Sequence, residues 1–228
     1  MTVLVRMLGA PSVEVDGAPA PAPRGRKSWA LLSYLALSER PPTRQRLAGL
    51  LFGSADDPMG ALRWNLAELR RSLRPYAEIT GDPVRLVFAD GVTTDVAMVA
   101  AGAPSDVPVG GELLEGMSFE GSAGFETWLL VERRRLAASA EALLHENALS
   151  ELGSGHYGAA VSAASQLVGL NPLDENYQAL LVRSLTASGQ REAALEQVQR
   201  CIRLFRRELG TEPSPAVRAA AEVAFGGT

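Results

Sequence analysis

Residues 43–74 read TRQRLAGLLFGSADDPMGALRWNLAELRRSLR, a stretch that predicts two helices joined by a short acidic turn. Thr43 is placed to cap the first helix, because its hydroxyl can accept a free amide of the first turn. Gly53 lies where that helix is expected to end. Asp57 can cap the second helix, and Pro58 suits its first position because that amide would be unpaired in any case. The pattern predicts a helix-turn-helix arrangement.

The second predicted helix has an apolar side and a cationic side. Its leucines follow one another by four, three and four residues and form one buried stripe: Leu62, Leu66, Leu69 and Leu73. At about 100° per residue, Trp64 and Arg71 lie opposite that stripe. The flank beside them carries Arg63, Ala67, Arg70 and Arg74. Such a helix is typical of a recognition helix that enters a nucleic-acid groove.

The same pattern also fits a solvated basic face on an ordinary helical hairpin, and taken alone it favours neither interpretation. The distribution of charge adds information. The formal net charge is −4, yet residues 1–94 hold 12 Arg and Lys against 9 Asp and Glu, and residues 95–228 hold 10 against 17. Between residues 24 and 74 the counts are 10 basic and 4 acidic. A basic window in an otherwise acidic chain indicates a surface that faces phosphate.

The general properties place the chain among cytoplasmic proteins. Its 228 residues suit one large domain or two small ones. No apolar run approaches the roughly 18 residues of a membrane helix, and the N-terminal residues lack the features of a secretion signal. Cys201 is the only cysteine, which excludes an intramolecular disulfide and fits a reducing compartment.

The segments around residues 43–74 predict a winged helix. Residues 2–22 alternate as short antiparallel strands, and residues 27–39 (KSWALLSYLALSE) predict a helix with Trp29, Leu32 and Leu35 in the core. Residues 79–88 predict a hairpin with a tight tip, which would be the wing. Arg85 is its candidate phosphate contact; an ordinary outward residue on a strand is an equal alternative.

The remainder predicts helices. Residues 95–124 predict one short helix near residues 96–101 and loop, and residues 125–152 predict a long helix. The pattern at residues 155–160 recurs at residues 189–194, an offset of 34 residues that is the tetratricopeptide (TPR) period. A final helix is expected from Ser214-Pro215. Arrays of this kind are usually docking scaffolds.

Several segments, in this order along the chain, resemble the short bacterial transcriptional activators of the SARP (antibiotic regulatory protein) type. They are RKSWALLSYLAL (26–37), TRQRLAGLLF (43–52), ALRWNLAELRRSL (61–73), GELLEGMSF (111–119), FETWLLVERRRL (125–136), LVGLNPLDENYQALLVRSLTASGQREAAL (167–195) and RRELGTEPSP (206–215). The resemblance implies an α+β N-terminal winged helix of OmpR type, with an N-terminal β-sheet, followed by an all-α TPR-like helical domain. The expected domains are 1–94, an OmpR-type DNA-binding domain, and 95–228, a bacterial transcriptional activator domain (BTAD). The stretch ends after the helical domain, as in small members of the family.

The resemblance implies a sequence-specific transcriptional activator. It would bind double-stranded promoter DNA as a homodimer on direct repeats and contact RNA polymerase holoenzyme, including its sigma factor. The candidate DNA-binding residues are Arg24, Lys27, Thr43, Arg44, Arg46, Arg63, Trp64, Ala67, Arg70, Arg71, Arg74 and Arg85. Trp64 is expected either at the groove floor or in the seam to the wing. Arg71→Ala is expected to weaken DNA binding by more than about 1 kcal/mol with little change in melting temperature.

No catalytic, metal or cofactor site is expected. His145 and His156 lack neighbours at metal-ligand spacing, and Asp56 and Asp57 are explained as helix capping. Cys201 is expected to be a small buried hydrophobe. The run Glu132–Arg135 fits a solvated helix face with internal ion pairs. Two other classes stay open: a TPR-type protein–protein adaptor, and a ligand sensor whose winged helix is not a primary DNA reader.

Overall fold

The computed structural model describes residues 1–101 and 111–222, which form two compact units. The described part of the first unit is residues 1–101 and 111–138, and that of the second is residues 139–222. The division falls within helix α5 (Ala123–Gly153). Within the described ranges, no helix has both the length and the apolarity required to cross a membrane.

A four-stranded sheet opens the first unit. Its order is β3 (Ala18–Pro19), β2 (Ser12–Val15), β1 (Val3–Arg6) and β6 (Val92–Thr94). The first three strands are antiparallel, as predicted, with Val3 opposite Val15 and Val5 opposite Val13. β1 also pairs with β6 in parallel, a contact that local patterns do not indicate. Val3 and Val5 are buried because alternate side chains face the same side of a strand.

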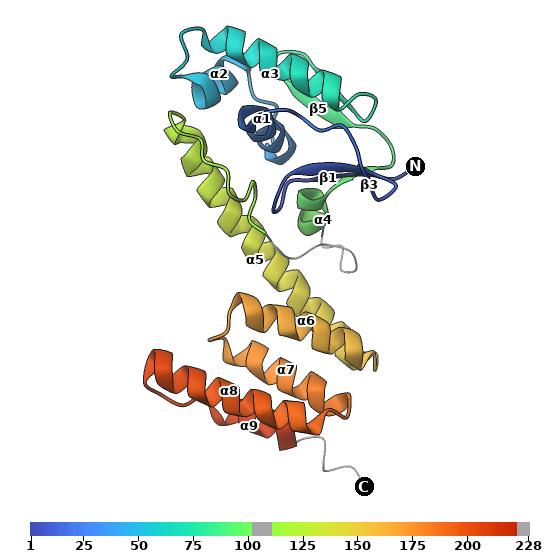
Figure 1. Cartoon of the computed structure of the whole chain (residues 1–228), viewed down its shortest axis with the longest axis vertical. Coiled ribbons are helices and arrows are strands. Elements are labelled where there is room, and N and C mark those ends of the chain that lie inside the picture. Colours follow the sequence, from blue (N-terminus) through green and yellow to red (C-terminus); the bar gives the residue numbers. More distant parts are fainter. Residues whose placement is uncertain (102–110, 223–228) are drawn as a thin grey trace. The chain divides into compact units, whose positions relative to one another are not determined.

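Three helices follow, and their ends form as the sequence predicts. They are α1 (Arg26–Leu37), α2 (Arg44–Phe52) and α3 (Pro58–Ser72). The Thr43 hydroxyl accepts from the Arg46 amide at 3.2 Å, and Asp57 Oδ1 accepts from the Gly60 amide at 2.7 Å. The four-leucine stripe of α3 is buried, with each leucine no more than 1% exposed. Figure 1 shows α3 at the outer edge of this unit, beside β5.

The predicted wing is present. Strands β4 (Ala77–Thr80) and β5 (Arg85–Phe88) pair antiparallel, with Thr80 opposite Arg85. Gly81 begins the tip with a φ of 79°, a conformation that glycine adopts without steric cost. Sheet, three helices and hairpin form a winged helix, so the predicted α+β class of the N-terminal part is confirmed.

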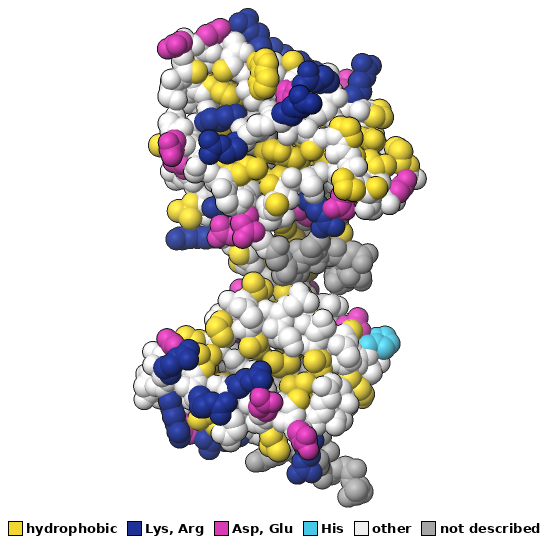
Figure 2. Space-filling view, viewed as in Figure 1, with side chains coloured by type: hydrophobic (Ala, Val, Ile, Leu, Met, Phe, Trp, Pro, Cys, Tyr) yellow, Lys and Arg dark blue, Asp and Glu magenta, His cyan; other side chains and the backbone are white. Residues whose placement is uncertain are grey.

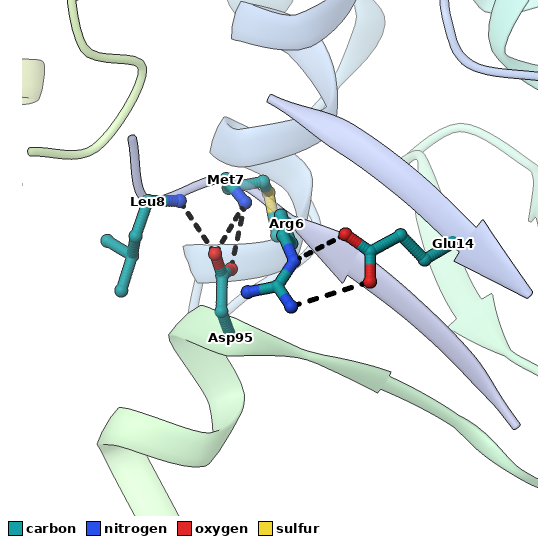
Figure 3. A network of polar contacts seen from close by, with 5 residues as sticks. All are labelled: Arg6, Met7, Leu8, Glu14 and Asp95. Carbon is teal, nitrogen blue, oxygen red and sulfur yellow. Dashed lines mark hydrogen bonds and ion pairs between the residues drawn. The ribbon is translucent and has the colours of Figure 1, made fainter. Parts of the chain in front are cut away.

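A buried carboxylate joins the sheet to α4 (Asp95–Ala101) (Figure 3). Asp95 is 1% exposed and accepts the Met7 amide at 2.8 and 2.9 Å and the Leu8 amide at 2.7 Å. Burial raises the pKa of this carboxyl above its ordinary value, and the backbone N–H groups oppose that rise. Asp95 therefore fixes the end of β1 against the start of α4.

The first turns of α5 complete the core of this unit. Phe125 is fully buried, and its ring lies 4.9 Å from Phe119 and 5.2 Å from Trp128. Arg133 donates to the Leu113 carbonyl at 2.8 Å and to the Leu114 carbonyl at 3.0 Å. The prediction of a solvated helix face at residues 132–135 is therefore wrong for Arg133, because this residue anchors the loop before α5.

The second unit is all-helical, as predicted. The rest of α5 is followed by α6 (Tyr157–Leu170), α7 (Glu175–Ala187), α8 (Arg191–Leu209) and α9 (Pro215–Glu222). α6 and α8 begin at equivalent positions of the sequence repeat. α7 lies at the centre of the core, where Leu180 and Val182 are fully buried. Cys201 lies in the same core at 1% exposure, and burial raises its pKa to about 11.

Candidate nucleic-acid interface

The face of α3 opposite its leucine stripe is open to solvent. Trp64 is 61% exposed, and Ala67, Arg63, Arg70 and Arg74 are also exposed. Figure 2 shows Lys and Arg side chains over α3 at the edge of this unit. The helix phase inferred from the sequence is therefore correct, since every position assigned to the outer side is accessible.

Arg71 lies on that face but is held by a buried partner. It donates to the carboxylate of Glu68, whose side chain is 3% exposed whereas that of Arg71 is 70% exposed. Glu68 also accepts the Arg24 amide at 3.0 Å. Arg71 thus neutralises a carboxylate inside the unit while its own side chain remains at the surface. The expectation that Arg71 affects DNA binding alone needs correction, because the residue also has a structural role.

The other arginines of the face differ in how firmly they are held. Arg70 donates from Nε to the Ile79 carbonyl of β4 at 2.8 Å, which ties the wing to α3. Arg63 lies 3.6 Å from Asp57, and both side chains are about two-thirds exposed. Arg74 and Arg85 form no hydrogen bond or ion pair through their side chains with any described residue. Arg74 and Arg85 are therefore the unengaged cations at the end of α3 and on the wing.

The start of α2 is already occupied by groups of the chain. The Thr43 hydroxyl accepts a hydrogen bond from the Arg46 amide, and the carboxylate of Asp82 at the wing tip accepts one from the Arg44 amide at 2.9 Å. Arg44 donates from Nε to the Gly81 carbonyl at 3.3 Å, and Arg46 donates from Nε to the Tyr34 hydroxyl at 3.1 Å. Because the Asp82 carboxylate occupies the Arg44 amide, the candidate DNA contacts Arg44 and Arg46 are left with their guanidinium groups. The remaining N–H groups of the two guanidinium groups are still available.

Lys27 is half-buried, and its ammonium is directed toward α2 and the residue before α5. Its ammonium donates to the Leu51 carbonyl at 2.7 Å and to the Ser122 hydroxyl, and burial lowers its pKa. These contacts correct the expectation that Lys27 adds to a grip on DNA. Arg24 is exposed, and its side chain has no partner among the described residues. It lines a shallow hollow together with Trp64 and Phe119.

Trp64 therefore lies beside the start of α1, and the side-chain contact between α3 and the wing is made by Arg70. This corrects one of the two expected placements of the indole. Asn65, which follows it, is 6% exposed and accepts from the Ser28 hydroxyl at 2.9 Å, so it is a packing residue between α1 and α3.

Sequence reasoning missed two groups that shape this surface and one group that lies in the second unit. Glu68 holds Arg71, and Asp82 accepts from the Arg44 amide at the start of α2. Helix spacing predicts neither the burial of Glu68 nor the contact of Asp82 with a distant segment. The third is a basic cluster in the second unit, where the acidic average hides Arg200, Arg203, Arg206 and Arg207 near the end of α8. Figure 2 shows Lys and Arg side chains over that helix. The three- and four-residue spacing of these arginines was the sequence signal that could have revealed the cluster.

Comparisons with known proteins agree with this architecture. The structure is similar to that of EmbR from Mycobacterium tuberculosis in complex with a low-affinity phosphopeptide, with a TM-score of 0.59 and 19% sequence identity. The similarity covers 97% of this chain and 64% of the EmbR chain, so this chain spans less than two thirds of that protein's length. At this identity the likeness concerns the fold.

No curated protein matches the chain in sequence. The model of the family described as "Bacterial transcriptional activator domain" matches residues 97–223, more than half of the chain. The match begins at α4 and contains every helix of the second unit. The chain therefore belongs to the bacterial transcriptional activator domain family, a family of transcriptional activators.

Proposed function

We propose that the protein is a cytoplasmic, non-enzymatic activator of transcription that binds promoter DNA through an OmpR-type winged helix. The observation that carries the proposal is the exposed side of α3, where Trp64 and Ala67 lie among arginines and directly opposite a buried leucine stripe. A helix of this composition, supported from behind by α1 and α2, has the form that enters a major groove.

In this mechanism the residues of α3 have different tasks. Arg63 beside the indole and Arg74 just beyond the end of α3 contact phosphates or the acceptor edge of guanine. Trp64 and Ala67 lie against the groove floor, where they can pack on a thymine methyl group. Arg70 holds the wing in place, and Arg85 on the wing contacts an adjacent phosphate. Arg24 extends the cationic surface on the α1 side.

Activation requires more than one chain and a second contact. The proposed unit on DNA is a side-by-side pair bound to direct repeats that are in phase with the helical turn of about 10 base pairs. The helical unit contacts RNA polymerase holoenzyme, including its sigma factor. The family match over residues 97–223 supports a role in activation. The end of α8 carries four exposed arginines, of which Arg200, Arg206 and Arg207 are paired with glutamates and Arg203 has no partner among the described residues.

The direct test is a salt series of DNA binding by the full chain and two charge-matched variants. Each phosphate that is neutralised contributes about −0.9 to the slope of log K against log salt. Arg74→Gln should weaken binding and reduce that slope by about one phosphate. Arg203→Gln removes the same charge from an exposed, unpartnered residue of the second unit, and it should change neither quantity. Equal effects of the two variants would show that net charge, and not the α3 face, governs binding.

The salt series also separates the two rival classes. A protein–protein adaptor would have no DNA affinity to lose at any salt concentration. A ligand sensor that does not read DNA would give the same result, and it would show a rise in melting temperature with its ligand. Retained affinity with a salt slope near zero would likewise contradict the proposed phosphate contacts.

A further inference from the structure

An open hollow of about 1140 Å³ lies in the first unit, away from the exposed face of α3. It is bounded by the end of α1, the loop that leads into α2, helix α4 and the first turns of α5. All of the described residues that line it belong to one compact unit. Neither the wing nor α3 contributes to it, so the proposed DNA contacts of α3 do not explain it.

The lining of the hollow includes two aromatic rings and several small residues. Tyr34 and Trp128 lie with their ring centroids 4.8 Å apart at an interplanar angle of 60°. Ala97 and Ala100 of α4, both exposed, also line the hollow, and their short side chains fill little of it. Ligand sites generally combine apolar and aromatic walls with a few polar groups that fix orientation. This hollow has the size and the lining for an aromatic ring system.

The charged groups of the hollow favour an anion. Three arginines and two glutamates line it: Arg40, Arg46, Arg135, Glu39 and Glu132. Arg135 is paired with Glu132 at 2.7 Å. Arg46 donates only from Nε, to the Tyr34 hydroxyl, and Arg40 is exposed with no partner among the described residues. The described part of the lining therefore carries one excess positive charge, with donors unused on the guanidinium groups of Arg40 and Arg46.

We propose that this hollow binds an amphipathic aromatic monocarboxylate, with the ring system against Trp128 and the carboxylate on Arg40 and Arg46. Planar guanidinium groups suit a carboxylate because they can donate two parallel hydrogen bonds. A single carboxylate matches the excess charge, whereas a dianion would leave one charge uncompensated.

Occupation of the hollow would affect α2. Arg46 belongs to the first turn of that helix, and Thr43, which caps the helix, also lines the hollow. A bound carboxylate would draw the Arg46 guanidinium inward, so it would compete with any DNA phosphate at this helix. This second step rests on the proposed DNA-binding function. The ligand site itself does not.

Titration calorimetry of the full chain with 2-naphthoate tests the site, with 2-naphthamide as the uncharged analogue of the same shape. Naphthoate should bind at concentrations up to about 1 mM, and the amide should bind at least about tenfold more weakly. Arg40→Gln should weaken naphthoate binding by a similar factor. Ala97→Trp should abolish it, because the added ring fills an exposed position of the hollow. Arg134→Gln, an exposed α5 residue outside the lining, should bind as the wild type does.

Three outcomes would overturn the site: no binding of naphthoate, equal binding of the amide, or an effect of Arg134→Gln as large as that of Arg40→Gln. Fluorescence anisotropy of a labelled duplex tests the second step. Naphthoate should reduce DNA affinity of the wild type and leave that of Ala97→Trp unchanged. Calorimetric binding without any DNA affinity would contradict the proposed function while leaving the ligand site in place. If naphthoate and DNA bound at the same time and neither changed the affinity for the other, only the proposed coupling between the two sites would be contradicted.

Discussion

Arg71 and Glu68 form an ion pair in which one partner is at the surface and the other is inside the unit. The arginine side chain is 70% exposed, and the glutamate side chain, one helical turn earlier, is 3% exposed. An exposed pair would contribute little to stability. This pair differs because removal of the arginine leaves a buried charge whose remaining partner is the Arg24 amide.

Arg71→Ala should therefore destabilise the first unit. The expected loss in the free energy of unfolding is about 1–2 kcal/mol, less than the ~3–5 kcal/mol of a fully buried pair because Arg71 is itself largely hydrated. Urea unfolding measures the loss. A second change, Glu68→Gln, should recover part of it, because the amide oxygen can still accept from Arg24. If Arg71→Ala left the free energy of unfolding unchanged, the Glu68 carboxylate would have to be solvated without Arg71.

Trp64 and Leu66 lie on the same helix, and their replacement should affect different properties. Trp64→Ala removes a side chain that is 61% exposed, so the midpoint of urea unfolding should shift little while DNA affinity falls. Leu66→Ala creates a cavity at a position 1% exposed and should cost about 2–5 kcal/mol. Denaturation and duplex binding of the two variants, measured side by side, check this. A large stability loss for Trp64→Ala would mean that the indole is a core residue.

The Asp95 carboxyl should make stability depend on pH. Its pKa is raised above the ordinary value of 3.8, chiefly by burial. A raised pKa in the folded state means that the contribution to stability is complete below the unfolded pKa and is lost as pH rises through the folded pKa. The stability advantage of the wild type over Asp95→Asn should therefore be largest below pH 3.8 and shrink as the pH increases. An advantage that grows with pH would contradict the direction of this shift.

Cys201 should be unreactive in the folded protein. It is 1% exposed, and its pKa is raised to about 11, so little thiolate forms near neutral pH. At pH 8 the reaction with a disulfide reagent such as 5,5′-dithiobis(2-nitrobenzoate) should be roughly 100-fold slower than in urea-unfolded protein. Equal rates would indicate that the α7–α8 core opens readily.

Local sequence signals were sufficient for the winged-helix core. The caps at Thr43 and Asp57, the leucine stripe and the hairpin with Gly81 at its tip all formed as predicted, because each depends on neighbours within a few residues. The parallel pairing of β1 with β6 was missed because the strands are far apart in sequence and β6 has three residues. Register between such segments depends on tertiary packing.

The candidate site was predicted in outline but not in its internal contacts. Helix spacing placed Trp64 and the arginines correctly on the outer side of α3. It gave no indication that Glu68 is buried, where it accepts from the Arg24 amide of the segment before α1. Lys27 was assigned to the surface from its charge, yet its ammonium finds a carbonyl and a hydroxyl inside the unit. For both Glu68 and Lys27, hydrogen bonds to segments distant in sequence determine where the side chain lies.

The Asp95 junction limits where the gene can be cut or recombined. A fragment that stops at residue 94 would lose the carboxylate that holds the Met7 and Leu8 amides, and it would uncover the surface on which Phe125 and Leu136 are buried. Exchange of the first unit between relatives should therefore carry the sequence through Ala138, within α5. Evolution faces the same restriction, since a crossover nearer the wing would separate a strand from the side chain that secures it.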